Sequence, residues 1–557
     1  MPRKFLVTSA LPYSNGKPHV GHIAGAYLPA DIYVRYLRAR GDDVLFVCGS
    51  DDNGVAVTIS AQKEGLTPEE TVAKYHAAQE RAFAGLGIEF DVYGGTHTPG
   101  YEDRHFEISQ DFFRTIHEKG YFTKKREAQL YDAAAEKFVP DRYVTGTCPY
   151  CGSENANGDQ CENCGKSIDP LELKNPKSIF SGTTPEVRET THWYLKLSDF
   201  EKPLKEWLES KTDWRPTVRN FALGQVATGL PTRAMTRDIS WGIPVPLDDE
   251  EAKGKVLYVW FDAPIGYVSF TASLLQQRGE PWQDYANWWK NPDCKIVHFI
   301  GEDNIVFHAL IWPAMLLAEG SYQLPHAVVA NSFLNIKKPG EGEEKFSKSR
   351  GNALWIEDFL QEFDPDPLRY YLTAIAPEGA RTPYQPDEFV ARNDGELADK
   401  VGNLINRATT FAHKYFDGKV PPEGARDDVD RAMLAACREQ AAKVAEHIEG
   451  YRFKAALGEF MNLARAGNVY FDQKKPWSQR KESLEACGTT INVGLQVVKA
   501  MTTIMQPFLP FSARRVLATL ALDESALAWD KACEELPSGH ALGPAEVLFR
   551  KLAVRPT

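Results

Sequence analysis

The sequence predicts an α/β fold in which a doubly wound parallel sheet is split by an insertion and followed by an all-helical domain. Short, almost wholly apolar segments such as Phe5–Val7 and Val44–Cys48 alternate with segments of helical spacing, which is typical of strands buried on both faces of a sheet. Residues 120–255 interrupt this alternation, and after about residue 390 amphipathic helices replace the strand patterns. The pattern is Rossmann-like.

The first half of the sheet domain begins with a βαβ unit. The strand at Phe5–Val7 is followed by a turn-rich loop, helical spacing over residues 21–40 and the strand at Val44–Cys48. The pattern returns in the second half, where a strand at residues 295–300 precedes a helix-like segment at 305–317 and a strand at 327–330. We therefore expect two halves of one sheet that are separated by the insertion.

Five segments follow from these patterns. They are a first half of the catalytic domain at 1–119, a connective insertion at 120–255, the second half at 256–330, a linking segment at 331–390 and a helical domain at 391–557.

Composition and net charge restrict the classes of protein to which this chain can belong. The 557 residues are 43% hydrophobic and 25% charged, as in soluble enzymes of several domains. The net charge of −12 argues against a protein that coats nucleic acid without specificity. We find no run of about 18 apolar residues and no apolar leader, so we expect a cytoplasmic enzyme without a membrane span.

A histidine motif lies where the first strand's loop becomes a helix, at residues 18–22, which read Pro-His-Val-Gly-His. A helix N-terminus favours anions, and His19 and His22 can both donate to a phosphate. Gly21 lacks the Cβ that would block a nucleotide. Taken alone, the motif favours capping or surface histidines, and its position after the first strand strengthens the phosphate-binding interpretation.

A lysine motif follows in the linking segment, at residues 345–349, which read Lys-Phe-Ser-Lys-Ser. Glycines on both sides of it make a mobile loop plausible, and Lys345 and Lys348 could neutralise a leaving pyrophosphate. Taken alone, the segment favours a solvated, flexible basic loop without a binding role.

Four of the nine cysteines cluster in the insertion as two CxxC pairs, Cys148 with Cys151 and Cys161 with Cys164. Two such pairs at close range suit one tetrahedral zinc site, and with all four positions filled by thiolates the metal would be structural. The alternatives are two disulfides or four unused thiols; a reducing compartment and the regular spacing favour zinc.

Together, the histidine and lysine motifs resemble the HIGH and KMSKS pair of the class I aminoacyl-tRNA synthetases. Val20 stands for Ile and Phe346 for Met, while the polar positions are kept. The insertion is too small for the editing domain of the leucine, isoleucine and valine enzymes. Its zinc knuckle, and the segments around Leu11, Trp260 and Glu302, are similar to the methionyl-tRNA synthetase family.

The resemblance implies the roles of the nucleotide-site residues. His19 and His22 would contact the phosphates of ATP, Gly21 would sit under the adenine, and Lys345 and Lys348 would stabilise the departing pyrophosphate with Mg²⁺. The other expected members of this site are Gly301, Glu302, Asp303, which would bind the ribose, and Arg237, which resembles a family arginine near the leaving group.

The resemblance also implies an aromatic pocket for methionine, whose thioether is favoured by aromatic contacts. Asp51 would bind the α-ammonium group. The family often reads Asp-Glu-His-Gly here, whereas this chain reads Asp-Asp-Asn-Gly at 51–54. Asp51 is retained, so the departure affects only a contact behind it. Ordinary core packing is the alternative for the tryptophans. The expected pocket residues are Ala10, Leu11, Tyr13, Asp51, Trp260, Ala263, Pro264, Tyr267, His308 and Trp312.

The helical domain is expected to read the anticodon. Asn403 and Arg407 lie four residues apart on one helix face, and both can bond base edges. Trp477 can stack on an unpaired base, although packing between helices is its alternative role. These three residues look like the family's anticodon contacts, and Asp399 stands where the family commonly has Asn.

The resulting hypothesis is a methionine–tRNA ligase that forms methionyl-adenylate from ATP and methionine and transfers methionine to the 3′-terminal ribose of tRNA(Met), the initiator included. We expect one structural Zn²⁺, Mg²⁺ bound with ATP, and a monomer. Two alternatives stay open: a class I synthetase for another amino acid, such as cysteine, and a non-catalytic RNA-binding relative.

Overall fold

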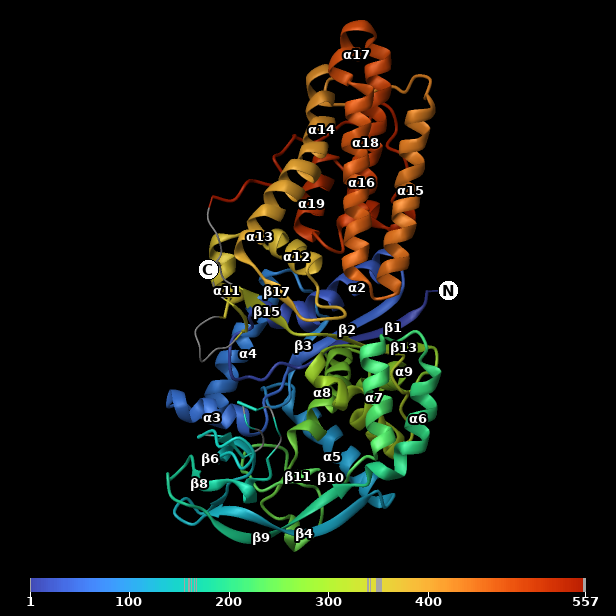
Figure 1. Ribbon diagram of the computed structural model, residues 1–557. Coiled ribbons are helices and arrows are strands. Elements are labelled where there is room, and N and C mark those ends of the chain that lie inside the picture. Colours follow the sequence, from blue (N-terminus) through green and yellow to red (C-terminus); the bar gives the residue numbers. More distant parts are fainter. Residues whose placement is uncertain are drawn as a thin grey trace.

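Five parallel strands form the central sheet, in the order β14-β13-β1-β2-β3 (Figure 1). They are β1 Lys4–Ser9, β2 Asp43–Ser50, β3 Val92–Gly95, β13 Cys294–Gly301 and β14 Ala327–Asn331. The computed structural model describes residues 2–337 apart from 155, 159, 160, 162, 165 and 167, and then 340, 342–346 and 353–553. The strand order reverses between β1 and β13, which confirms the doubly wound class.

Both faces of this sheet are buried because alternate side chains of each strand enter different cores. Phe5 and Val7 of β1 belong to the core that continues toward the helical domain, whereas Leu6 belongs to the core on the opposite face. Phe46 and Leu45 divide in the same way on β2. This is why the strands read as continuous apolar runs rather than as alternating patterns.

Helices cover the two faces of the sheet. After β1 the chain forms one helical run made of α1 Val20–His22, a π-helical turn at Ile23–Tyr27 and α2 Leu28–Ala39. The remaining helices of this domain are α3 Val55–Glu64, α4 Pro68–Gly85, α5 Glu102–Glu118, α8 Val259–Gln277, α9 Ala286–Trp289 and α10 Trp312–Glu319. The β1–helix junction places the histidine motif at the carboxyl end of the sheet.

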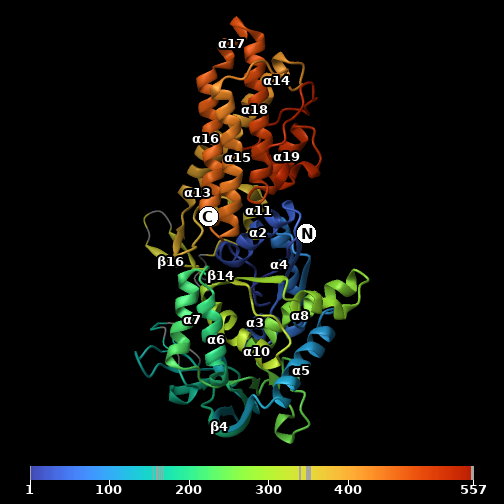
Figure 2. The same ribbon diagram turned by 90° about the vertical axis from the view of Figure 1, so that its right-hand side faces the viewer.

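The insertion lies at the end of the molecule opposite the helical domain (Figures 1 and 2). Its longest feature is an antiparallel pair, β4 Phe122–Asp132 with β9 Glu186–Leu195. A smaller sheet of β6 Val144–Thr147, β7 Ala156–Asn157 and β8 Lys174–Ser178 carries the cysteines. Its other helices and strands are β5 Lys137–Phe138, α6 Glu201–Ser210, α7 Pro216–Thr228, β10 Arg233–Ala234 and β11 Thr236–Arg237, and β11 pairs with β12 Val256–Leu257, which follows directly after the insertion.

The linking segment carries a second small sheet in which β15 pairs with β16 and β17. Its elements are β15 Leu334–Lys337, β16 Glu343–Lys345, α11 Ile356–Glu362, α12 Pro365–Ala374, β17 Thr382–Tyr384 and α13 Pro386–Arg392. The segment runs between the sheet domain and the helical domain. Strand β15 follows directly after β14, and Lys345, the first residue of the lysine motif, pairs with β15.

The helical domain stands on the sheet domain as a long bundle with α17 at its far end (Figure 1). A π-helical segment, Asn393–Gly402, leads into α14 Asn403–Tyr415, and then come α15 Asp428–Glu449, α16 Phe453–Lys474, α17 Pro476–Glu482, α18 Leu484–Met505 and α19 Pro510–Thr519. Helix α18 is buried from Cys487 to Met505, so the others pack around it.

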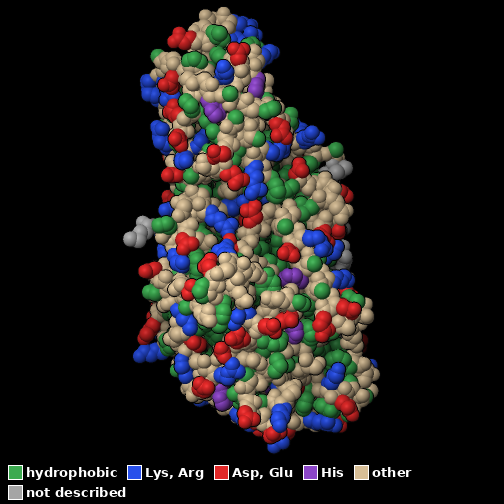
Figure 3. Space-filling view, turned by 180° about the vertical axis from the view of Figure 1, so that it is seen from behind, with side chains coloured by type: hydrophobic (Ala, Val, Ile, Leu, Met, Phe, Trp, Pro, Cys, Tyr) green, Lys and Arg blue, Asp and Glu red, His purple; other side chains and the backbone are tan. Residues whose placement is uncertain are grey.

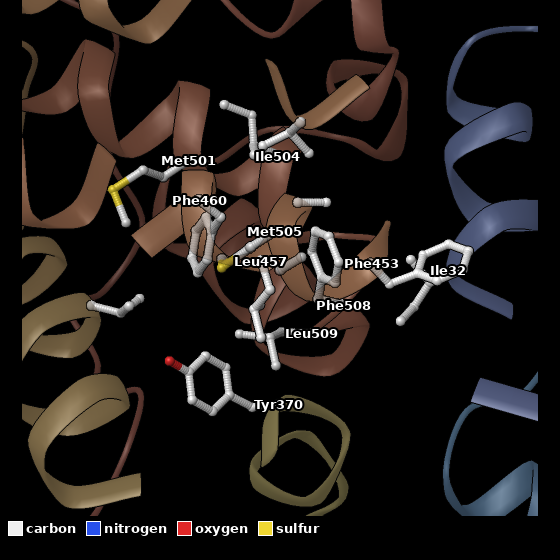
Figure 4. Close-up of a cluster of buried hydrophobic side chains, with 14 of the residues drawn as sticks. Ile32, Tyr370, Phe453, Leu457, Phe460, Met501, Ile504, Met505, Phe508 and Leu509 are labelled. Atoms are coloured by element: carbon white, nitrogen blue, oxygen red, sulfur yellow. The ribbon is translucent and has the colours of Figure 1, made fainter. Parts of the chain in front are cut away.

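The bundle and the sheet domain share one core. In Figure 4, Ile32 of α2 lies close to Phe453 of α16 and Phe508, while Leu457 and Met505 continue the cluster into the bundle. Buried Arg369 of α12 adds polar bonds across the same junction, because it donates to Asp31 of α2 at 2.6 Å and to the carbonyls of Pro507 and Phe508. The two domains are therefore held in a fixed relation.

Charge is dispersed over the surface. On the face shown in Figure 3, acidic and basic side chains are interspersed, as a net charge of −12 with 64 basic residues allows. Among the described residues, no helix is long and apolar enough to cross a membrane.

Candidate functional site

A cavity of about 430 Å³ opens at the carboxyl ends of β1 and β13. This is the point where the strand order reverses, which is where open α/β sheets bind their ligands. Nine residues predicted from the sequence line the cavity, and they come from segments far apart in the chain. They are Ala10, Leu11, Tyr13, His19, Gly21, His22, Trp260, Gly301 and Asp303.

The histidine motif and the lysine motif meet in this cavity. The His19 ring stacks on His22 at 3.8 Å and on Phe346 at 5.4 Å between ring centroids. Phe346 is the apolar position of the lysine motif and lines the cavity. Two segments that the sequence alone leaves ambiguous thus form the walls of a single site.

Local hydrogen bonds fix both histidine rings. His19 caps the helix, with its Nδ1 accepting from the N–H of Gly21 at 3.1 Å, and His22 Nδ1 accepts from the N–H of His19 at 3.1 Å. Since both Nδ1 atoms accept, a neutral ring carries its proton on Nε2. Each histidine can therefore present an N–H donor to an anion.

Neighbouring side chains leave too little room for a Cβ at position 21. A Cβ at this position would lie 2.9 Å from Cε1 of His19 and 3.4 Å from Cδ2 of Phe346. Any larger residue would push apart the ring stack that joins the two motifs.

Two residues of the lysine motif, Lys345 and Phe346, lie within the described part of the chain. Lys345 closes strand β16 opposite Asn335 of β15, whereas Lys348 lies outside the described residues. Beyond it, the chain returns to the histidine motif, because Val20 donates to the carbonyl of Leu354 at 3.1 Å and Ile356 donates to that of Pro18 at 3.2 Å. The described residues on either side of this part of the chain, Phe346 and Leu354, thus both contact the histidine motif.

Of the other residues predicted to bind the nucleotide, two line the cavity and one does not. Gly301 and Asp303 line the cavity, and a Cβ on Gly301 would approach Oδ1 of Asp303 to 2.7 Å. Glu302 instead forms an ion pair with Arg381 at 2.7 Å. Its contact in the structure is with the linking segment rather than with the cavity.

Arg237 lies outside the main cavity. Its guanidinium is 3.8 Å from the ring centroid of Tyr258, and it lines a separate cavity in the insertion together with Tyr194 and Glu127. Tyr258 precedes α8, which carries Trp260. The structure therefore places Arg237 next to the start of α8, in a cavity separate from the one that the histidines line.

The predicted methionine residues form an aromatic group behind the cavity. Tyr13 meets Trp260 edge to face at 6.2 Å, and Trp260 stacks on Phe307 at 3.9 Å. Deeper in, Tyr267 and His308 are joined by a 2.9 Å hydrogen bond. Burial lowers the pKa of His308 to about 4, so at neutral pH the ring is uncharged and suits a thioether.

Three further predicted pocket residues are buried among helices. Ala263 and Pro264 lie on α8, on the turn after Trp260. Trp312 is 1% exposed and packs against Phe112 and Trp289 at centroid distances of 6.0 and 6.1 Å. Its surroundings are those of a core residue, which was the alternative for this tryptophan.

Asp51 and Asp52 are adjacent and buried but differ in their bonding. Asp52 accepts hydrogen bonds from Ser14 Oγ at 2.6 Å and Thr98 Oγ1 at 2.8 Å. These bonds connect the loop after β2 to the loops after β1 and β3. Oδ1 of Asp51 has no hydrogen-bond partner among the described residues. Burial raises the pKa of Asp51, and the nearby carboxylates of Asp262 and Asp52 raise it further.

The sequence did not predict two residues that help to shape the site: Gln79, which lines the cavity, and Phe307, which stacks on the cavity residue Trp260. Gln79 of α4 donates to the carbonyls of Tyr13 at 2.8 Å and Gly16 at 3.2 Å, which holds the loop before the histidine motif. Phe307 backs Trp260. A glutamine inside a helix gives no motif signal, whereas Phe307 could have been found from its place beside His308.

The four cysteines of the insertion come together. Their Sγ atoms all lie within 4.8 Å of one another, with 3.9 Å between Cys148 and Cys164 and 3.7 Å between Cys151 and Cys161. Four thiolates about 2.3 Å from a tetrahedral zinc would be roughly 3.8 Å apart. The cysteines are free of disulfides, so the geometry fits one metal ion with no open position.

The predicted anticodon residues share one face near the far end of the bundle. Asn403 donates to Asn468 at 3.4 Å, and Arg407 reaches Asp472 at 3.3 Å. The guanidinium of Arg407 lies 5.9 Å from the ring centroid of Trp477, whose side chain is 38% exposed. Asp399 is bound to Lys551 at 3.0 Å.

Comparisons with known proteins agree along the whole chain. The family described as tRNA synthetases class I (M) matches residues 5–409, and the anticodon binding domain of methionyl tRNA ligase matches 420–555. The methionine–tRNA ligase of Thermococcus onnurineus is 46% identical over 99% of this chain and 75% of its own length, and that of Bacteroides fragilis is 47% identical over 99% and 79%.

A solved structure resembles the fold over its full length. The methionyl-tRNA synthetase of Mycobacterium tuberculosis, bound by methionyl-adenylate, aligns with a TM-score of 0.81 and 26% identity, covering 99% of this chain and 100% of that one. With the family matches and the meeting of the histidine and lysine motifs, this establishes that the chain belongs to the methionyl-tRNA synthetases of class I.

Proposed function

We propose that this chain activates L-methionine with ATP and transfers it to the 3′-terminal ribose of tRNA(Met), including the initiator, which is the reaction of a methionine–tRNA ligase. One observation carries the proposal: the ring of His19 lies between His22 and Phe346 at a cavity on the sheet's switch point. The stack joins the two phosphate-binding motifs that adenylate formation requires.

In the first step the methionine carboxylate attacks the α-phosphorus of ATP and pyrophosphate leaves. The protein forms no covalent intermediate, so its residues position the reactants and stabilise charge. His19 and His22 donate to the phosphates through Nε2, and Lys345 and Lys348 neutralise the leaving group, with Mg²⁺ arriving as part of the nucleotide. Gly21 leaves room for the adenine, and Asp303 binds the ribose.

Methionine occupies the aromatic region between Tyr13, Trp260 and the Tyr267–His308 pair. Its ammonium group pairs with Asp51, whose buried Oδ1 otherwise lacks a partner among the described residues. In the second step a terminal ribose hydroxyl attacks the mixed anhydride and releases AMP. Asn403, Arg407 and Trp477 select the tRNA at the far end of the bundle. The monomeric state and the cytoplasmic location stay predictions.

Amino-acid-dependent ATP–pyrophosphate exchange tests this proposal. We expect methionine to support exchange and the other nineteen amino acids to fall short of it by several orders of magnitude, because a pocket lined by neutral aromatic groups suits the thioether. Exchange driven by cysteine would favour the alternative class I enzyme. Absence of exchange with every amino acid would identify a non-catalytic relative.

The cysteine cluster holds one structural zinc ion in this proposal. The supporting observation is the match between the Sγ separations and a tetrahedral Cys₄ site. The cluster packs with Val55 and Ile59 of α3, the helix that begins just after Asp51. The metal therefore supports the fold next to the amino acid pocket and takes no part in the chemistry.

Replacing Cys161 with serine is expected to remove most of the zinc, since the thiolate is lost and zinc binding contributes to folding. Elemental analysis after dialysis against a chelator should give one zinc per wild-type chain and far less than one for Cys161→Ser. The partly exposed Cys533 provides the control, because it lies in the helical domain and Cys533→Ser should keep its zinc. Equal zinc in both variants would refute the site.

A further inference from the structure

Each of two buried carboxylates beside the proposed methionine pocket has one oxygen that lacks a hydrogen-bond partner among the described residues. Asp51 is 2% exposed and Asp262 is 0% exposed, and in each Oδ1 has no hydrogen-bond partner among the described residues. Burying an ionised carboxylate without a partner is costly. Two of them near one another, both lacking a bond to Oδ1, point to a positively charged ligand.

The surrounding residues hold Asp262 at a defined place. Its Oδ2 accepts from Nδ2 of Asn53 at 3.1 Å, and Oδ1 of Asn53 is in turn 2.9 Å from Nδ1 of His97. The His97 ring stacks on Trp241 at 3.9 Å. Asn53 stands in the Asp-Asp-Asn-Gly segment that departs from the common family pattern, and its amide ties the two acid-bearing segments together.

Both carboxylates lie beside cavity residues. Asp51 forms a parallel bridge with Tyr13, which lines the cavity. Asp262 lies two residues after Trp260, which also lines it, and both carboxylates act on Tyr13 in raising its pKa, although burial is the larger cause. The acids therefore sit just behind the two rings that close the aromatic end of the cavity.

A purely structural role for Asp262 does not account for its bonding. Acids in the first turn of a helix usually bond its free N–H groups. Asp262 is in the first turn of α8, yet its described hydrogen bond comes from the side chain of Asn53 and not from the helix. Asp52, by contrast, is saturated by Ser14, Thr98 and the N–H of His97.

We infer that Asp262 is a second carboxylate for the α-ammonium group of methionine, held by Asn53 and acting together with Asp51. The inference rests on the proposed function and deepens it. Two anions facing one ammonium discriminate against amino acid analogues that lack the charge. Without ligand, the two carboxylates destabilise each other, because burial and mutual repulsion raise the pKa of Asp51.

The test replaces Asp262 with asparagine, whose amide oxygen can still accept from Asn53. Binding of L-methionine and of 4-(methylthio)butanoate, which lacks the ammonium group, is measured by quenching of tryptophan fluorescence in the full chain. Asp262→Asn is expected to weaken methionine binding at least tenfold and to leave binding of the amine-free analogue within about twofold. Its melting temperature should match or exceed that of the wild type, since one buried charge is gone.

Asp366 supplies a matched control. It is 2% exposed, it also has an unpartnered Oδ1 among the described residues, and it lies at the junction with the helical domain, where its other oxygen accepts from the N–H of Ser512. Asp366→Asn should leave methionine affinity unchanged. A second test variant, Asn53→Ala, keeps both carboxylates but removes the hydrogen bond that holds Asp262. It should weaken methionine binding by a smaller factor than Asp262→Asn does.

The outcomes separate this inference from the proposed function. Unchanged methionine affinity in Asp262→Asn, or an equal loss for methionine and the amine-free analogue, would overturn the role of Asp262 while the wild-type enzyme still binds methionine. If Asp262→Asn does not fold, a selective loss of methionine over the analogue in Asn53→Ala supports the inference and no selective loss overturns it. A wild-type chain that binds no methionine would instead refute the proposed function.

Discussion

Replacing His22 with alanine is expected to slow methionine-dependent ATP–pyrophosphate exchange by about 10²–10³-fold. Removing one preorganised donor from a site of developing charge typically costs this much in kcat. The ring also accepts from the N–H of His19 at 3.1 Å and stacks on its ring. The loss therefore combines a missing phosphate contact with a looser His19. Initial rates of exchange at saturating methionine measure the effect.

Two variants separate these contributions. His22→Asn keeps a side-chain acceptor for the N–H of His19 and should recover part of the loss. His117→Ala, which removes an exposed histidine from the last turn of α5, should match the wild type. Exchange at the wild-type rate in His22→Ala would show that the histidine motif has no role in activation.

Trp477→Ala should lower the rate of tRNA charging by about 10–100-fold while leaving pyrophosphate exchange near the wild-type rate. Stacking of a base on an aromatic side chain contributes about 1–3 kcal/mol, and each 1.4 kcal/mol is about tenfold. The indole is partly exposed on α17, at the far end of the bundle from the cavity (Figure 1). Anticodon recognition and activation can therefore fail independently.

Trp282 offers a matched control for this variant. It is also a partly exposed tryptophan with an arginine over its ring, since Arg104 lies 3.9 Å from the centroid, but it belongs to the sheet domain. Trp282→Ala should charge tRNA normally. If Trp477→Ala charged tRNA as fast as the wild type, Trp477 would be a packing residue rather than an anticodon contact.

The fold class was predictable because both strand burial and helix spacing are local patterns. The continuous apolar strands around Leu6 and Val47 require a sheet covered on both faces, and this is what the two cores provide. The histidine motif was located by its position between a strand and a helix. In each case short-range residue order carries the information.

Other parts of the site depend on long-range packing that residue order does not encode. The stack of Phe346 on His19 joins segments on opposite sides of the insertion. Trp312 and Trp260 look alike in sequence, yet one is enclosed by Phe112 and Trp289 and the other lines the cavity. The bond from Asn53 to Asp262 likewise emerges only when α8 packs against the loop after β2.

In the proposed mechanism, the ATP phosphates are held between the histidine-bearing helix start and the lysine-bearing segment. A structure of the chain with methionine and a non-hydrolysable ATP analogue tests it most directly. We predict the phosphate oxygens within hydrogen-bond distance of His19 and His22 on one side and of Lys348 on the other. Nucleotide bound elsewhere, or phosphates remote from either motif, would contradict the account.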